Sequence, residues 1–196
     1  MEYQQIFSAC IQANQTKLDI DSLTSFCYEV KRRDKKGRKI SNLGGWQSGN
    51  IKKNTHPEFV KLLSEIQIAA NAYHNKLQFK KEYEQKLNNI WININGKGHS
   101  NEYHIHAKTA ISGCFYLSDS NFPIRFKHPY EEISPYYWHE EFIETFTTFN
   151  CGQWSITPKK NSLIMFPPWL YHKVVMNEED TDRISMAFNL MCERRK

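Results

Sequence analysis

Hydrophobic and polar positions in the first part of the chain repeat at helical spacing in two segments. In residues 21–33 an apolar face recurs behind Asp21, a candidate N-cap. Residues 56–80 carry a longer apolar face, and Thr55 with Glu58 fits a capping box at its start. We therefore expect two helices, the second with its apolar face packed on a sheet.

From residue 88 onward the pattern changes to short segments typical of β-strands. The expected strands cover residues 89–95, 102–107, 111–117, 124–127, 154–157, 162–166, 173–176 and 184–191. Such a run after two helices predicts a mainly β fold, a cupin-like double-stranded β-helix (jelly roll) buttressed by helices. The length of 196 residues suits one domain over residues 1–196, with a helical part at 1–87 and the jelly-roll core at 88–196.

Composition excludes several classes of protein. Charged residues at 24% and hydrophobic residues at 40% are ordinary for a soluble globular protein. The net charge of +5 forms no basic helix or stripe, so we expect no nucleic-acid partner. Five scattered cysteines without a CxxC pair indicate reduced thiols and a cytoplasmic location. Neither a signal peptide nor an apolar run long enough to span a membrane is expected.

Histidines form the first candidate site. On an extended strand, His104 and His106 would point to the same face. A third histidine, His172, follows the apolar run 163–171, which ends in a turn with two prolines. Imidazoles that converge in this way can bind a divalent metal, so His104, His106 and His172 are the candidate ligands.

The third ligand has three interpretations, because the usual iron site of this type takes two histidines and one carboxylate. His106 can be the ligand itself, Glu102 on the same strand face can supply the carboxylate, or water can fill the position. We favour His106, because it has the spacing of an adjacent ligand. Glu102 lies roughly 6.6–7 Å along the strand from His104, which is far for one ion.

Arg183 is a candidate anion-binding residue. Residues 182–189 alternate, which places Arg183 and Ser185 on one strand face and the apolar side chains on the other. The planar guanidinium makes two parallel hydrogen bonds to a carboxylate, so this pair could hold the far carboxylate of 2-oxoglutarate. The competing interpretation is an edge-strand arginine in a surface ion pair with Asp180 or Asp182.

Three further features remain open at this point. Tyr116 can donate a hydrogen bond to the cosubstrate or serve as a core ring. The glycine-containing segment 41–48 is expected to be a loop, with Trp46 in the core or in a substrate-side wall. The long aromatic segment 128–153 has no clean period, and a loop of that length is usually functional, often a lid.

Several motifs together resemble a known family, the 2-oxoglutarate/Fe(II)-dependent dioxygenases common in cyanophages and marine bacteria, which are distant relatives of the prolyl hydroxylases. The resemblance covers nearly the whole chain, and segment 128–153 is the part without a recognised pattern. It rests on residues 41–48, 91–95, Gly98, Asn101, His104, His106, 112–117, 166–174 and 183–189.

The resemblance implies Fe(II) and 2-oxoglutarate, with ascorbate as an optional addition. It implies hydroxylation of an aliphatic C–H in a protein or small-molecule substrate, with release of succinate and CO2. Iron would bind His104, His106 and His172, while Arg183, Ser185 and Tyr116 would contact the cosubstrate. A phage-encoded member would work in the host cytoplasm.

Two other functions fit the same residues. The first is a cupin-like metalloenzyme with three histidine ligands that does not use 2-oxoglutarate. The second is a non-catalytic jelly-roll binding module, in which Tyr136, Tyr137 and Trp138 would line a sugar-binding face. Arg183 discriminates between the first alternative and an oxygenase, because only the oxygenase needs it.

Overall fold

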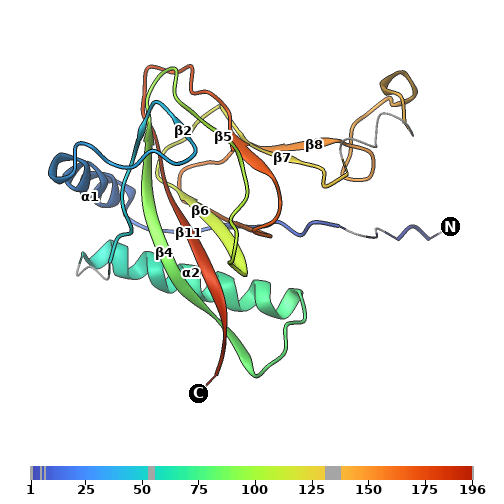
Figure 1. Ribbon diagram of the computed structural model, residues 1–196, viewed down its shortest axis with the longest axis horizontal. Helices are drawn as coiled ribbons and strands as arrows, with labels where there is room; N and C mark the ends of the chain where they lie inside the picture. The colour runs from blue at the N-terminus through green and yellow to red at the C-terminus, as the bar shows by residue number, and fades with distance from the viewer. Residues whose placement is uncertain (1, 5, 7, 53–55, 131–137, 196) are drawn as a thin grey trace.

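The computed structural model describes the chain except residues 1, 5, 7, 53–55, 131–137 and 196. Its described part holds two facing antiparallel sheets with two helices outside them (Figure 1). The larger, the major sheet, has the order β1 (Gln12–Gln15), β9 (Ser162–Phe166), β6 (Ile111–Tyr116), β11 (Arg183–Arg194), β4 (Tyr83–Asn95) and β3 (Trp46–Gln47). The minor sheet has the order β2 (Asn42–Leu43), β5 (Ser100–His104), β10 (His172–Val174), β7 (Ile124–Lys127) and β8 (Gln153–Ile156). The predicted jelly roll buttressed by helices is confirmed.

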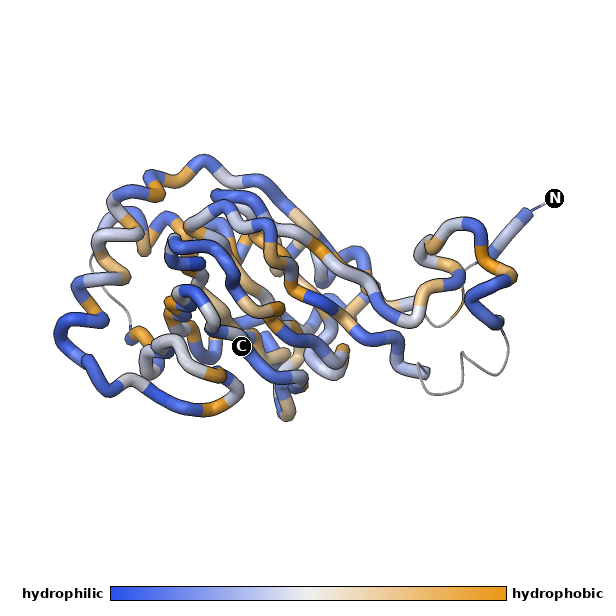
Figure 2. The backbone as a smooth tube through the Cα atoms, turned by 90° about the horizontal axis from the view of Figure 1, so that it is seen from above, coloured by the Kyte–Doolittle hydropathy of each residue, from blue (hydrophilic) through white to orange (hydrophobic). Residues whose placement is uncertain are grey.

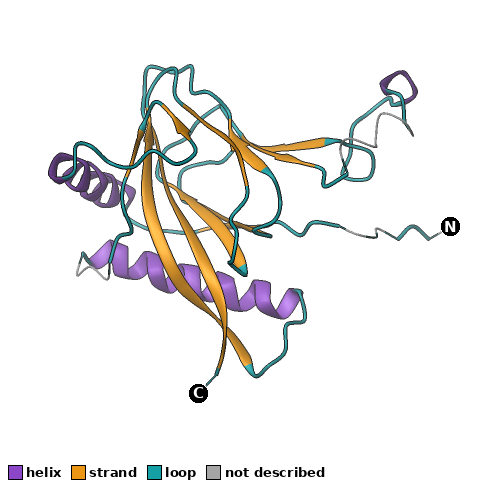
Figure 3. Cartoon of the chain, viewed as in Figure 1, coloured by secondary structure: helices purple, strands orange, loops and turns teal. Residues whose placement is uncertain are grey.

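The helices are α1 (Ile20–Arg33) and α2 (Pro57–Lys76), and both lie on one side of the long strands (Figure 3). Their predicted starts need correction. Asp19, not Asp21, caps α1 by accepting a hydrogen bond from the Ser22 amide. The N-cap residue of α2 is His56, and the predicted capping residue Thr55 lies outside the described residues. Glu58 instead accepts from the Asp19 amide at 3.0 Å, which ties the start of α1 to α2.

The long strands β4 and β11 have two different faces. Where they pair, Ile184 lies opposite Ile94 and Met186 opposite Ile92, and these residues belong to the core that also contains the buried residues of α1 and α2. The alternate positions carry the polar pair Arg183 and Asn95, and they face the minor sheet. Because successive side chains point to opposite faces, the same strands build the apolar core and a polar interior.

Three short strands in the first 50 residues were not predicted. β2 and β3 have two residues each, which is too short for an alternating pattern, and β1 is a polar edge strand. Segment 41–48, expected to be a loop, contains β2 and β3 and links the two sheets. Trp46 is 6% exposed and donates to the Asp34 carbonyl at 2.7 Å, so its core interpretation is confirmed.

The described residues of segment 128–153 project from the body beside the described N-terminal residues in both views (Figures 1 and 2). Its described part contains the short 3-10 helix η2 (Glu140–Phe142) and exposed aromatic side chains such as Trp138. Tyr136 and Tyr137 lie outside the described residues, so the predicted sugar-binding face stays a prediction.

The five cysteines have free thiols. Among the described helices, none has the length and apolar character of a membrane span.

Candidate metal centre and anion pocket

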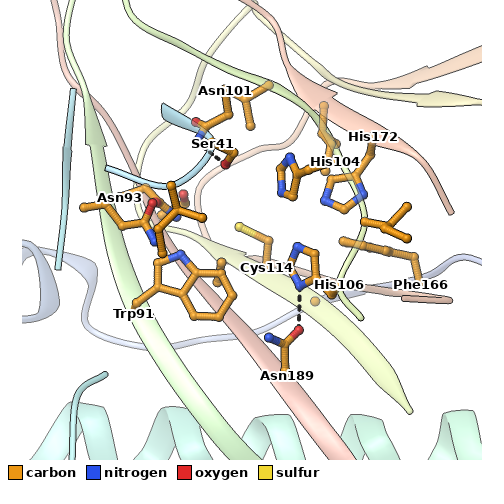
Figure 4. A pocket seen from close by; sticks show the side chains of 18 of the residues that line it. Ser41, Trp91, Asn93, Asn101, His104, His106, Cys114, Phe166, His172 and Asn189 are labelled. Carbon is orange, nitrogen blue, oxygen red and sulfur yellow. Dashed lines mark hydrogen bonds between the residues drawn. The ribbon is translucent and has the colours of Figure 1, made fainter. Parts of the chain in front are cut away.

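One cavity of about 270 Å³ lies between the two sheets (Figure 4). All six residues that the sequence singled out line this cavity: His104, His106, His172, Arg183, Ser185 and Tyr116. The structure therefore brings the candidate metal ligands and the candidate anion-binding residues into one site.

The three histidines form a compact cluster. His172, at the start of β10, pairs with His104, at the end of β5, in the strand register. The ring centroid of His104 lies 4.4 Å from that of His172, and the ring of His106 lies 5.1 Å from His172. One candidate ligand nitrogen from each ring lies within 4.8 Å of the other two, so the rings can share one ion.

His106 does not lie on the strand where the sequence placed it. β5 ends at His104, so the expected strand 102–107 is three residues too long at this end. The backbone of His106 is held instead by a hydrogen bond from its amide to the Pro168 carbonyl at 2.9 Å. The Thr109 hydroxyl donates to the His106 carbonyl at 3.2 Å. These contacts, and not strand alternation, bring the third imidazole into the cluster.

Hydrogen bonds fix which ring nitrogen faces the cluster. Nδ1 of His104 lies 2.7 Å from the Glu102 carbonyl, and Nδ1 of His172 lies 2.8 Å from the Leu170 carbonyl. A carbonyl only accepts hydrogen bonds, so both Nδ1 atoms carry the proton and both Nε2 atoms keep a lone pair. Metal-binding histidines in proteins are usually held in this way.

Burial keeps the imidazoles neutral. Desolvation lowers the pKa of His172 to about 3, and the neighbouring ring of His104 adds to the effect. Burial also lowers the pKa of His104 and of His106. Only the neutral ring binds a metal, so three neutral imidazoles in one cluster fit a divalent ion.

Glu102 has no place in this cluster. Its side chain is exposed and does not line the cavity, and its backbone carbonyl is the atom that contacts His104. Among the described residues, the group able to share a metal consists of the three histidines. The Glu102 interpretation is therefore not supported by the geometry.

Arg183 lines the cavity and is buried, with 4% of its surface exposed. The alternative of a surface ion pair is wrong, because Asp180 pairs with Lys97 at 2.8 Å and Asp182 accepts from the Tyr28 hydroxyl. Within the described part of the chain, Nε of Arg183 has no hydrogen-bond partner. A buried cation without a counter-ion is costly, so a bound anion at this position would stabilise the protein.

Tyr116 contacts the same guanidinium, and Ser185 is its partner on the neighbouring strand. They lie opposite each other in the register of β6 and β11, and the guanidinium carbon of Arg183 lies 5.4 Å from the Tyr116 ring centroid. The buried Tyr116 hydroxyl has no partner among the described residues, and burial raises its pKa well above the ordinary value. The hydroxyl therefore stays protonated and can donate to the same anion, so a carboxylate group of 2-oxoglutarate fits this pocket.

Sequence reasoning missed the role of Asn189. Its side-chain oxygen lies 2.6 Å from Nδ1 of His106, although the two residues are 83 positions apart (Figure 4). The signal was the alternation along β11, because Asn189 lies an even number of positions beyond Arg183 and so shares its face.

A family model described as "Putative 2OG-Fe(II) oxygenase" matches residues 89–189, just over half of the 196-residue chain. The chain belongs to the 2OG-Fe(II) oxygenase family. The matched range contains the three clustered histidines, Tyr116, Arg183 and Ser185. Fe(II) and 2-oxoglutarate are therefore its cofactors, and the neutral histidines and the unpaired arginine fit them.

Solved structures with the same fold include two hydroxylases. A Pseudomonas putida prolyl-4-hydroxylase is 14% identical with a TM-score of 0.63, over 95% of this chain and 93% of that one. A Trichoplax adhaerens prolyl hydroxylase in complex with a hypoxia inducible factor peptide fragment is 12% identical with a TM-score of 0.63, over 93% and 83%.

A third solved structure with this fold is HygX from Streptomyces hygroscopicus, with nickel and 2-oxoglutarate bound. It is 9% identical with a TM-score of 0.60, over 92% of this chain and 82% of that one. These likenesses show the fold. No curated protein sequence matches the chain.

Proposed function

We propose that this oxygenase hydroxylates an aliphatic C–H of a protein or small-molecule substrate, with release of succinate and CO2. The observation that carries the proposal is the shared cavity, which is lined both by three neutral histidines and by a buried arginine whose Nε has no partner among the described residues. A metal site and a carboxylate site in one small cavity suit a cosubstrate that binds both.

Each side chain has a role in this proposal. His104, His106 and His172 hold Fe(II) through Nε2. Arg183 and Ser185 bind the far carboxylate of 2-oxoglutarate, and the Tyr116 hydroxyl donates a further hydrogen bond. The bound iron and cosubstrate supply the oxidising chemistry, while the packed sheets orient the reactants and exclude water.

The remaining wall of the cavity supports a substrate whose reacting part is uncharged. Among the described residues that line the cavity, Arg183 is the only one with a full charge, because burial keeps the histidines neutral. Once a carboxylate pairs with Arg183, the lining groups besides the imidazoles are amides, hydroxyls, the Cys114 thiol and apolar side chains such as Trp91. A peptide segment meets this requirement, as does a neutral small molecule.

The two alternatives receive less support from the same observations. A cupin-like enzyme that does not use 2-oxoglutarate leaves the buried Arg183 without a counter-ion. A non-catalytic binding module gives no reason for three neutral histidines clustered in one cavity. The family and the geometry together favour the oxygenase.

Turnover of 2-oxoglutarate tests the proposed function. After anaerobic loading with Fe(II), we expect the protein to convert 2-oxoglutarate to succinate when O2 is admitted, slowly without a substrate. Succinate is measured by mass spectrometry, with a zinc-loaded sample as the control because zinc has no redox chemistry. Stoichiometric iron without any loss of 2-oxoglutarate would favour the cupin-like enzyme, and failure to bind iron would favour the binding module.

His106→Asp tests the third ligand. We expect this variant to keep iron binding, because a carboxylate at this position restores the set of two histidines and one carboxylate. His106→Ala, in contrast, should bind iron more weakly. Iron content after anaerobic reconstitution and desalting gives the comparison. If both variants retain iron as the parent does, water and not residue 106 occupies the third position.

A further inference from the structure

The three histidines differ in what holds their rings. Nδ1 of His104 and of His172 each faces the backbone carbonyl two residues earlier. Any amino acid supplies such a carbonyl, so these two orientations follow from the backbone. Nδ1 of His106 faces a side chain, the amide oxygen of Asn189. The orientation of His106 therefore depends on the identity of one distant residue.

Asn189 is built into the wall of the cavity. It is buried on β11, and its Oδ1 accepts from the Ser112 hydroxyl at 2.8 Å as well as lying 2.6 Å from Nδ1 of His106. The register of β11 with β4 shifts directly after Asn189, so that Leu190 pairs with Leu87. Such a bulge re-aims side chains and often lies next to a functional site.

The direction of the Asn189 amide decides which nitrogen of His106 is free. With Oδ1 toward the ring, Nδ1 must carry the proton, and Nε2 keeps its lone pair. With the amide reversed, its NH2 group would donate to Nδ1 and the proton would move to Nε2. A proton at Nε2 would block a metal at that atom. In the structure Oδ1 faces the ring, and the Ser112 hydroxyl donates to the same oxygen at 2.8 Å.

We propose that Asn189 is a positioning residue that holds His106 in the Nδ1–H form and aims its Nε2 at the metal. The proposal rests on the proposed function, because His106 is a ligand there. It explains how a histidine serves at a position where the usual site has a carboxylate: a neutral acceptor on β11 fixes its tautomer and its direction.

Cobalt binding tests the proposal with a stable stand-in for Fe(II). We expect Asn189→Leu, which keeps the branched shape but has no acceptor, to bind Co(II) about 10- to 100-fold more weakly than the parent, the usual effect of losing such a partner. Asn189→Asp keeps an acceptor and should retain the parent's affinity. Titration followed by the visible absorption of bound Co(II) measures both.

Asn89→Leu is the matched control. Asn89 lies opposite Asn189 in the sheet and lines the same cavity, and its Oδ1 has no hydrogen-bond partner among the described residues. It should bind Co(II) as the parent does. The proposal is overturned if Asn189→Leu keeps the parent's affinity, if Asn189→Asp loses as much as Asn189→Leu, or if Asn89→Leu loses as much.

A second measurement needs neither metal nor a variant. Long-range proton–nitrogen NMR spectra of the metal-free parent at neutral pH should show His106 protonated at Nδ1, and a proton at Nε2 would overturn the proposal even if Asn189→Leu fails to fold. Failure of the parent to bind Co(II) would count against the proposed function instead. The NMR result would still decide the role of Asn189.

Discussion

His172→Ala is expected to abolish tight Fe(II) binding. His172 is buried, its Nδ1 is held by the Leu170 carbonyl, and its ring stands between the ring of His104 and that of Phe166. Loss of this side chain removes one of three ligands, and the site that remains is incomplete. The loss of affinity should exceed the factor of about 10–100 that removal of an outer hydrogen-bond partner causes. Iron content after anaerobic reconstitution measures it.

His74→Ala is a suitable control for this variant. His74 is also buried, but it lies on α2 and contacts Gln85, on the far side of the major sheet from the cavity. Its loss can lower the melting temperature, yet it should leave the iron content unchanged. If His172→Ala folds and still binds iron as the parent does, the three-histidine site is wrong.

Arg183→Ala is expected to weaken 2-oxoglutarate binding far more than iron binding. A charge-assisted hydrogen bond contributes about 1.5–3 kcal/mol, and a two-bond contact to a carboxylate lies at the upper end. The dissociation constant for 2-oxoglutarate should therefore rise roughly 10- to 150-fold. Arg183→Lys should recover only part of this, because an ammonium group cannot make the two parallel bonds. Anaerobic calorimetric titration of the metal-loaded variants gives the values.

The burial of Arg183 adds a second expectation. With no anion bound, the buried guanidinium has an unpartnered Nε, so its replacement by alanine should not greatly lower the free energy of unfolding of the ligand-free protein. Arg194→Ala, at the exposed end of the same strand, should bind 2-oxoglutarate normally. Equal affinity in the parent and in Arg183→Ala would remove the main reason to prefer an oxygenase over a plain cupin.

Local patterns in the sequence determined most of the fold and the composition of the site. Alternation along 182–189 placed Arg183 and Ser185 on one face, and in the structure that face lines the cavity. Strand and helix periods are properties of the backbone over a few residues, so they can be read without knowing the fold. For the same reason the eight strands from β4 onward were found, although β4 begins at Tyr83 and not at residue 89. The two-residue strands β2 and β3 were too short to give a pattern.

Only the tertiary structure decided how the third imidazole reaches the cluster and which atom holds it. β5 ends at His104, so His106 owes its place to contacts with Pro168, Thr109 and Asn189. The burial of Arg183 and the exclusion of Glu102 were decided in the same way. These features depend on sheet register, on where a strand stops, and on contacts such as the one between His106 and Asn189, 83 positions apart. The sequence by itself determined which residues share a face, and packing determined which of those faces meet.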